Sequence, residues 1–266
     1  MGAAGGIISS AEDMIKWMQF QLNNGINGKD TLFTKREQTT MWTPHVNYPV
    51  SDRAREVYGG RNFNGYGLGW GTTEYHGKQM VSHTGGYDGM YSAVTMLPTE
   101  KIGVVILTNT MDGIGTLLSY EIIDRLLGLP QQDWKNRGIN QDKGHWADRA
   151  ARIKERTDAR IMGTKPSMDV VAISGLYRCP LFGDIRILEE NGKLTIDFVH
   201  SPQLKARLSH WHNDTYQLEW LEEQAWFEFG TVQIQMNNSG KPSGLLFDVP
   251  NDDIFFEEIK AVRVTP

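Results

Sequence analysis

Beyond Asp169 the sequence alternates apolar and polar residues with a period of two. Turn-forming pairs such as Asn191-Gly192 and Asn213-Asp214 separate the alternating segments. These segments are Ile185–Ile187, Leu194–Phe198, Tyr216–Trp220, Val232–Met236 and Leu245–Val249. Short strands that reverse direction at this density are typical of a closed or nearly closed antiparallel barrel. We therefore expect residues 169–266 to form an all-β barrel domain.

The residues before the barrel combine helical periods with short strand-like runs. Apolar residues recur at helical spacing between Ser10, a favourable N-cap, and Gly25, and again over 114–127. Strand composition occurs near 67–75, 80–83, 91–97 and 102–108. Their short connections favour antiparallel hairpins. The sequence thus predicts an α+β domain over 1–130, in which helices flank an antiparallel sheet.

Two stretches lack a clear strand or helix period. Residues 42–64 contain Pro44, Pro49 and a glycine pair, and we expect a long loop there. Residues 131–168 are polar and charge-rich, and we expect a linker that is partly helical, with a helix over 146–162.

Charge and cysteine content narrow the partners and cofactors. The net charge of −5 is spread over mixed signs without a basic stripe, so nucleic acid is not an expected partner. No apolar run approaches the ~20 residues of a membrane-spanning helix. Cys179 is the single cysteine, which excludes an internal disulfide, and we expect no metal or other cofactor. No secretory signal is recognisable, so the sequence leaves the compartment open.

The segment Met80–Gly86 reads Met-Val-Ser-His-Thr-Gly-Gly and carries the strongest sign of chemistry. It follows Tyr66–Trp70, which reads Tyr-Gly-Leu-Gly-Trp, and precedes two strand-like segments, Tyr91–Pro98 and Ile102–Asn109. Together these segments resemble the C-terminal half of the catalytic domain of the serine β-lactamase and penicillin-binding-protein superfamily, in particular its class C-like esterase and peptidase branch. The expected barrel is similar to the small lipocalin-like barrel appended to many hydrolases related to β-lactamases.

Three elements meet in the active site of that superfamily: a Ser-x-x-Lys nucleophile, a Tyr-x-Asn or Ser-x-Asn element, and a Lys-Thr-Gly or His-Thr-Gly strand. This chain contains the third element alone, because no serine has lysine three residues on and no tyrosine or serine has asparagine two residues on. The resemblance therefore implies that the nucleophile lies upstream of this chain or has been lost. We expect this chain by itself to be inactive.

The resemblance implies catalytic roles for four residues: His83, Thr84, Gly85 and Gly86. The N–H of Gly86 would be one oxyanion donor, and Gly85 would let the substrate approach. The Thr84 hydroxyl would bind polar groups of the substrate, and His83 takes the place of the family's lysine. A structural interpretation stands beside this one, because glycine pairs are common at hairpin ends and a lone histidine in a strand is usually a satisfied polar residue.

Histidine in place of lysine favours esterase or peptidase chemistry over β-lactamase chemistry, because a largely neutral imidazole anchors a substrate carboxylate less firmly than ammonium. The expected parent protein is a serine hydrolase that acts on a small ester, amide or peptide through an acyl-enzyme. The alternative is a non-catalytic ligand-binding or regulatory protein that uses the barrel or the remnant of the cleft. The expected partners are a missing N-terminal half or further copies in a homo-oligomer. The resemblance suggests a cell-envelope or secreted protein.

Two features of the barrel region also have alternative interpretations. The pair His210 and His212 has a spacing that can bind Zn²⁺ from one face of a strand, although no third ligand is evident nearby. Five aromatic residues either line a ligand pocket or fill the barrel interior. These aromatic residues are Trp211, Trp220, Trp226, Phe227 and Phe229.

Overall fold

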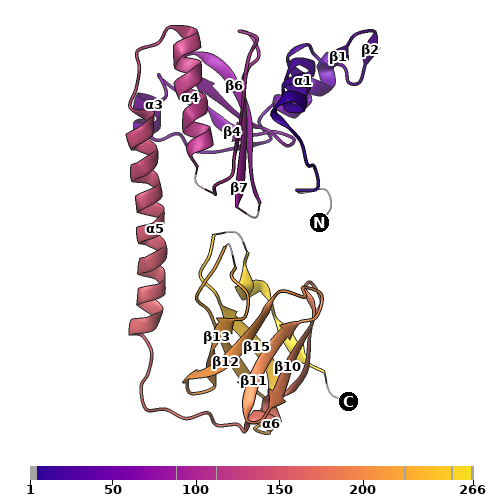
Figure 1. Ribbon diagram of the computed structural model, residues 1–266, viewed down its shortest axis with the longest axis vertical. Coiled ribbons are helices and arrows are strands. Elements are labelled where there is room, and N and C mark those ends of the chain that lie inside the picture. Colours follow the sequence, from indigo (N-terminus) through magenta and orange to yellow (C-terminus); the bar gives the residue numbers. More distant parts are fainter. Residues whose placement is uncertain (1–4, 88, 112, 225, 253, 265–266) are drawn as a thin grey trace. The chain divides into compact units, whose positions relative to one another are not determined.

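The computed structural model describes residues 5–87, 89–111, 113–224, 226–252 and 254–264. The chain divides into two compact units, residues 1–143 and 144–266 (Figure 1). This division falls inside one long helix. The domain limits expected from the sequence, after residues 130 and 168, remain a prediction.

An antiparallel sheet with helices on both faces forms the first unit, as the sequence predicts (Figure 1). Its strand order is β3-β4-β5-β6-β7-β8. The strands are β3 (Val46–Asn47), β4 (Asn64–Tyr66), β5 (Gly71–Tyr75), β6 (Lys78–Tyr87), β7 (Met90–Leu97) and β8 (Ile102–Thr108). A separate two-stranded ribbon comprises β1 (Ile26–Asn27) and β2 (Asp30–Thr31). The helices are α1 (Ala11–Leu22), α2 (Lys35–Trp42), α3 (Asp52–Val57), α4 (Ile114–Leu127) and the start of α5 (Trp134–Asp158).

The sheet is buried on both faces because successive residues of its central strands belong to different apolar clusters. Met80 packs with Leu97 and Trp134 on the face that α4 covers. Its neighbour Val81 packs with Met96 on the face that α1 covers, through Met18. Side chains alternate across a strand, so this division places one core on each side of the sheet.

The helix ends follow local capping chemistry. The Ser10 hydroxyl accepts a hydrogen bond from the Asp13 N–H at 3.2 Å, which confirms the predicted start of α1. Helix α4 spans the predicted residues and ends at Gly128, whose φ of 65° is left-handed. Helix α2 begins with a capping box between Thr34 and Glu37 that the sequence analysis did not identify.

Two expectations for local structure were wrong. Residues 42–64 contain β3, α3 and the first residue of β4 in place of a long loop. Helix α5 includes most of the expected helix over 146–162, but it begins at Trp134, well before the expected start, and ends at Asp158, shortly before the expected end. Its first turn is fixed by tertiary contacts, because the Trp134 indole is buried and donates a hydrogen bond to Asp124 at 2.7 Å. A polar helix held in this way has no apolar period that a sequence pattern can detect.

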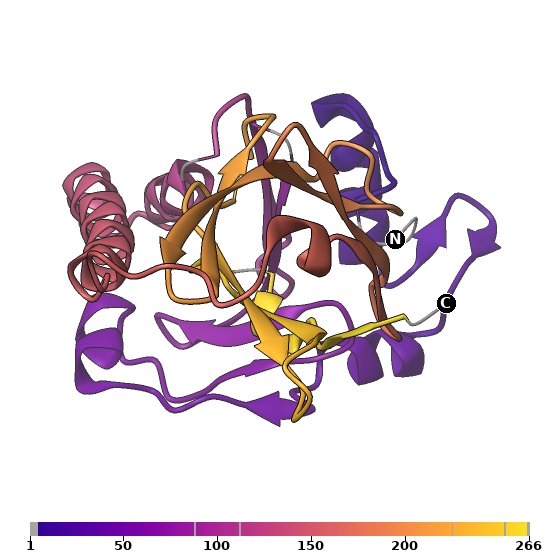
Figure 2. The same cartoon turned by 90° about the horizontal axis from the view of Figure 1, so that it is seen from below.

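In the described part of the second unit, eight antiparallel strands close into a barrel, which confirms the predicted fold. The strands follow one another around the barrel, and β16 pairs with β9 through Val262 and Arg178 to close it. The short helix α6 (Val170–Ile173) lies at one end of the barrel (Figures 1 and 2). The strands are β9 (Gly175–Cys179), β10 (Gly183–Glu190), β11 (Lys193–Phe198), β12 (Lys205–His212), β13 (Thr215–Trp220), β14 (Thr231–Met236), β15 (Pro242–Asp248) and β16 (Ala261–Arg263), with a 3₁₀ turn, η1 (Phe256–Glu258), before the last.

Side chains fill the barrel interior. Ile185 and Ile187 point inward from β10 and are almost fully buried, whereas Arg186 between them is exposed. Phe256 of η1 closes against a group of aromatic rings that includes Trp220 and Phe227. The aromatic residues of the barrel therefore pack against one another, which favours the interpretation that they fill the interior.

Candidate functional site

The four predicted site residues, His83, Thr84, Gly85 and Gly86, lie together in the second half of β6. On one side, β6 pairs with β7 from Val81 to Tyr87. On the other side, its pairing with β5 ends at Ser82. All four residues are exposed. The segment 83–87 therefore has one paired edge and one open edge.

The geometry of the β5–β6 hairpin determines which backbone groups face the open edge. His76 and Gly77 form its two-residue turn with φ values of 48° and 75°, the left-handed pattern of a type I′ turn. Such a turn is flanked by a hydrogen-bonded pair, and these pairs recur at every second residue of an antiparallel ladder. Counting from Lys78 in steps of two reaches Ser82, Thr84 and Gly86. The N–H and C=O groups of Thr84 and Gly86 thus point toward the open edge.

The backbone groups of the remaining two residues, His83 and Gly85, point toward β7. The Ser92 hydroxyl of β7 donates a hydrogen bond to the Gly85 carbonyl at 3.3 Å. A β-carbon at Gly85 would lie 3.1 Å from that hydroxyl oxygen, so glycine allows the close approach. His83 Nε2 lies 2.9 Å from the hydroxyl of Tyr66, the last residue of β4.

The segment Tyr66–Trp70 has a packing role that explains most of its sequence. A β-carbon at Gly67 would lie 2.1 Å from the Met41 carbonyl oxygen, so no larger residue fits. Gly69 adopts a left-handed φ of 76°. The Trp70 ring is buried and stacks on Trp17 with centroids 5.3 Å apart. Packing thus accounts for the two glycines and the tryptophan, but not for the hydroxyl of Tyr66.

A buried polar group fixes the far end of the same hairpin. Asp124 of α4 accepts hydrogen bonds from the Tyr75 hydroxyl and from Trp134 Nε1. Burial raises the pKa of Tyr75 well above its ordinary range, and the hydrogen bond to Asp124 adds to this. Burial also raises the pKa of the neighbouring Tyr120. Both hydroxyls therefore stay protonated, and the Tyr75 hydroxyl anchors β5 against α4 through Asp124.

The described residues contain no complete nucleophilic centre. Six of their serine hydroxyls donate to backbone carbonyls or carboxylates, and none of these six hydrogen-bonds to a histidine or lysine that would act as a base. No group of three or more His, Cys, Asp or Glu among them is placed to hold a metal ion. His210 Nε2 lies 2.9 Å from the Asn213 carbonyl oxygen, and His212 Nδ1 accepts from the Ile161 N–H. A register shift in β12 separates these two imidazoles.

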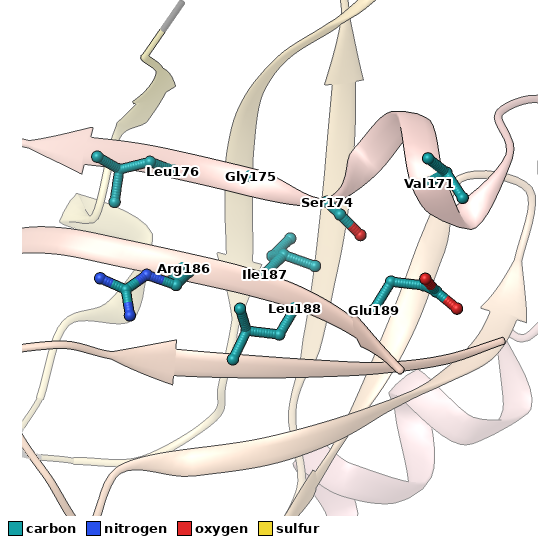
Figure 3. A pocket seen from close by; sticks show the side chains of 8 residues that line it. All are labelled: Val171, Ser174, Gly175, Leu176, Arg186, Ile187, Leu188 and Glu189. Atoms are coloured by element: carbon teal, nitrogen blue, oxygen red, sulfur yellow. The ribbon is translucent and has the colours of Figure 1, made fainter. Parts of the chain in front are cut away.

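The barrel also has a hollow of about 480 Å³ on its surface, near α6 (Figure 3). Arg186 and Leu188 of β10 and Leu176 of β9 line it, together with Val171 of α6. The Ser174 hydroxyl at its edge donates to the Val170 carbonyl at 2.8 Å. The hollow therefore offers an apolar wall with one guanidinium group, from Arg186, and one carboxylate, from Glu189.

Charged residues of α5 form ion pairs with Asp248, at the end of β15, and Asp252, in the loop that follows. Arg152 forms an ion pair with Asp252 at 2.8 Å, and Arg156 forms one with Asp248 at 2.8 Å. The hydrogen bond from Arg152 holds the pKa of Asp252 below its ordinary range. Among the described residues, no helix is both long enough and apolar enough to cross a membrane.

Comparisons with known proteins match the two units to different families. Residues 1–126 match the model of the β-lactamase family, and residues 159–263 match a domain of unknown function (DUF3471). The β-lactamase family is the one that the motifs of the sequence resemble. It covers the whole of β6 and its neighbouring strands.

Two curated relatives are fungal proteins named Unguisins hydrolase. The protein from Aspergillus violaceofuscus (strain CBS 115571), ungD, is 31% identical over 141 residues, which are 50% of this chain and 25% of that protein. The protein from Aspergillus campestris (strain IBT 28561), ungD', is 26% identical over 140 residues, which are 50% of this chain and 24% of that protein. The matched region thus spans about a quarter of the length of these relatives.

Solved structures show weaker similarity. The octameric penicillin-binding protein homologue from Pyrococcus abyssi aligns with a TM-score of 0.38 and 16% identity, over 96% of this chain and 47% of that one. The structure of SurE aligns with a TM-score of 0.32 and 16% identity, over 96% of this chain and 48% of that one.

Proposed function

Because residues 1–126 belong to the serine β-lactamase and penicillin-binding-protein superfamily, we propose that this chain supplies the oxyanion strand of a serine hydrolase whose nucleophile lies in another part of the protein. The homology supports a serine-hydrolase-like function. The observation that carries the proposal is the open edge of β6, where the Gly86 N–H points away from β7. An oxyanion donor must be exposed to substrate and fixed before the reaction, and this strand end meets both conditions.

The reaction would proceed by double displacement. A serine oxygen attacks the carbonyl carbon of an ester or amide, and the carbonyl π electrons move to the oxygen. The Gly86 N–H donates to that developing oxyanion, while the backbone groups of Thr84 bind an extended part of the substrate along the open edge. Collapse of the tetrahedral intermediate expels the alcohol or amine, and water then releases the acyl group from the serine.

The chemistry of the strand favours esters, amides or peptides as substrates. His83 stands where the family has lysine, and a largely neutral imidazole binds a carboxylate less strongly than an ammonium group. The two fungal relatives carry the name Unguisins hydrolase, and a hydrolytic reaction at this strand agrees with that name.

The proposal is tested by removing the donor in a protein that also contains the Ser-x-x-Lys segment. Gly86→Pro removes the N–H, and the rate with an activated ester should fall by at least the ~10²–10³ of one lost oxyanion donor. Gly86→Ala is the matched control, because it adds a side-chain atom but keeps the N–H. Circular dichroism and a thermal melt establish that each variant is folded. A folded proline variant with near-normal kcat would exclude β6 as the catalytic strand.

A second substitution separates recognition from chemistry. His83→Lys restores the charge that the family has at this position, so substrates with a carboxylate should bind more tightly while the rate with a neutral ester changes little. Equal effects on both substrates would contradict a role for His83 in recognition.

A non-catalytic role is the second candidate function. It is favoured by the absence of a Ser-x-x-Lys sequence from the 266 residues of this chain. In that case the open edge of β6 or the barrel would hold a ligand without turnover. Sequencing the coding region upstream of Met1 separates the two candidates, because an open frame with Ser-x-x-Lys followed by Tyr-x-Asn supports the hydrolase.

A further inference from the structure

Tyr66 and His83 form a side-chain pair at the open end of the sheet. The Tyr66 hydroxyl oxygen lies 2.9 Å from His83 Nε2, and the ring centroids are 6.0 Å apart. The two residues belong to β4 and β6, which β5 separates. Strand β5 begins at Gly71, the residue that pairs with both Tyr66 and Ser82 and contributes no side chain.

The position of Tyr66 is fixed independently of His83. The turn that follows it is pinned where Gly67 lies against the Met41 carbonyl, and the Leu68 N–H donates to the same carbonyl at 2.9 Å. Trp70 is buried at the other end of the turn. A phenylalanine at position 66 would have the same backbone and a ring of the same size. The hydroxyl is therefore the part of Tyr66 whose contact is specific to His83.

The chemistry of the two groups favours one direction for this hydrogen bond. A phenol has a pKa near 10 and keeps its proton at neutral pH, whereas the unprotonated nitrogen of a neutral imidazole is a strong acceptor. The phenol is the stronger donor and the imidazole nitrogen the stronger acceptor, which favours donation from Tyr66 to Nε2 with the imidazole proton on Nδ1. The structure gives His83 Nδ1 no hydrogen-bond partner among the described residues.

We propose that Tyr66 is a positioning residue that holds His83 as the Nδ1–H tautomer, so that β6 presents one oriented, neutral N–H donor to an acceptor oxygen of the ligand. The expected ligand group is a carbonyl or ester oxygen, because a neutral donor gains less from a full carboxylate than an ammonium would. The identity of the bound group as part of a substrate rests on the proposed function. The assignment of the His83 tautomer does not depend on the proposed function.

The tautomer can be measured on this chain by long-range ¹H–¹⁵N NMR of the histidine rings, with His83 assigned from the signals that His83→Gln removes. We expect the wild-type ring to carry its proton on Nδ1. Tyr66→Phe should shift the ring toward the Nε2–H form that is commoner in free imidazole. Tyr87→Phe is the matched control, because Tyr87 is an exposed tyrosine of the same strand with no bond to His83.

Two results would overturn the positioning role: a wild-type His83 protonated on Nε2, or a folded Tyr66→Phe variant whose tautomer is unchanged. The wild-type measurement keeps the test decisive even when the phenylalanine variant does not fold. Because no turnover is needed, an inactive full-length protein would refute the proposed function without affecting this result.

The donor role is tested separately with N-acetylglycine ethyl ester as the probe. Titration into the wild-type chain should perturb the His83 Nδ1–H signal, and the apparent Kd should rise about three- to tenfold in Tyr66→Phe, as expected for one neutral hydrogen bond. An unperturbed His83 signal at saturating probe, or equal Kd values in the two proteins, would show that the oriented imidazole does not bind acceptor oxygens.

Discussion

The barrel and the sheet are both antiparallel, but they differ in whether their outermost strands are paired. In the barrel every described strand pairs on both sides, because β16 returns to β9. In the sheet β8 is an edge strand, and β6 has no partner on one side beyond Ser82. Closure removes the unpaired backbone groups that allow a strand to bind another chain. Among the described strands, the unpaired backbone edges therefore belong to the first unit.

The barrel and the sheet also differ in how their apolar cores are arranged. The barrel has one continuous apolar core, whereas the sheet has two clusters on opposite faces. In a closed barrel the strands pair all of their backbone groups with one another and bury their apolar side chains in one core. In an open sheet, other elements must cover both faces and the backbone groups of the edge strands.

The largest expected effect concerns the nucleophile. A fluorophosphonate probe should leave this chain unlabelled, and ester turnover should be undetectable, because covalent catalysis needs an activated serine. Mass spectrometry of the intact protein measures the labelling. Stoichiometric labelling of a single serine would show that the sheet unit contains its own nucleophile, and the contrast with the barrel would then need another explanation.

The second prediction concerns association through the sheet. We expect the chain to form dimers or larger species through the apolar edge strand β8, and Leu107→Lys should shift the population toward monomer. Val262→Lys is the matched control, because Val262 is more exposed, at 63% against 43% for Leu107, but lies in a strand paired on both sides. Light scattering gives the mass. A monodisperse wild-type monomer would show that the open edges do not drive association.

The third prediction concerns the closed core. Phe256 is 1% exposed and contacts the rings of Phe198, Phe227 and Phe247. Phe256→Ala should destabilise the barrel by ~3–5 kcal/mol, and Val262→Ala by less than ~0.5 kcal/mol. Chemical denaturation followed by circular dichroism measures both. Loss of the sheet transition together with the barrel transition would mean that the two units unfold as one.

The smallest expected effect is an acid dependence of the barrel. Because the folded-state pKa of Asp252 is lowered by Arg152, the ion pair stabilises the fold above the ordinary aspartate pKa of about 3.9. This contribution is lost as the pH falls through the lower folded-state pKa. An exposed pair of this kind contributes ~0–1 kcal/mol. Urea denaturation at pH 6 and pH 3 should show a smaller pH effect in Asp252→Asn than in the wild type, and an identical effect would assign the acid dependence elsewhere.

Local sequence patterns predicted the parts of the fold that local chemistry determines. Helix α4 was found because its periodic apolar run ends at Gly128, and strands β7 and β8 were found from their strand composition and the short connection between them. The barrel was found from its alternating strands, although β9, β12 and β16 were not. Strands β9 and β16 are held by each other across the barrel closure, and β12 contains a register shift that interrupts its alternation.

The sequence predicted which consecutive residues form the candidate site, but not which side chains from other strands lie beside them. The His83–Gly86 motif was recognised because its four residues are consecutive. The contribution of Tyr66 was not, because the pair with His83 forms across an intervening strand and depends on where β5 begins. Residue spacing alone does not give the register of three strands.

The pairing of β16 with β9 has a consequence for the order of events during synthesis. Arg178 is translated long before its partner Val262, so the barrel stays unclosed while the intervening strands leave the ribosome. During that interval β9 has one free edge and the growing end of the barrel has another, which is the state in which nascent β-structure misassembles most readily. Closure of this domain is therefore a late event after translation of β16, and chaperone protection would matter most in the period just before it.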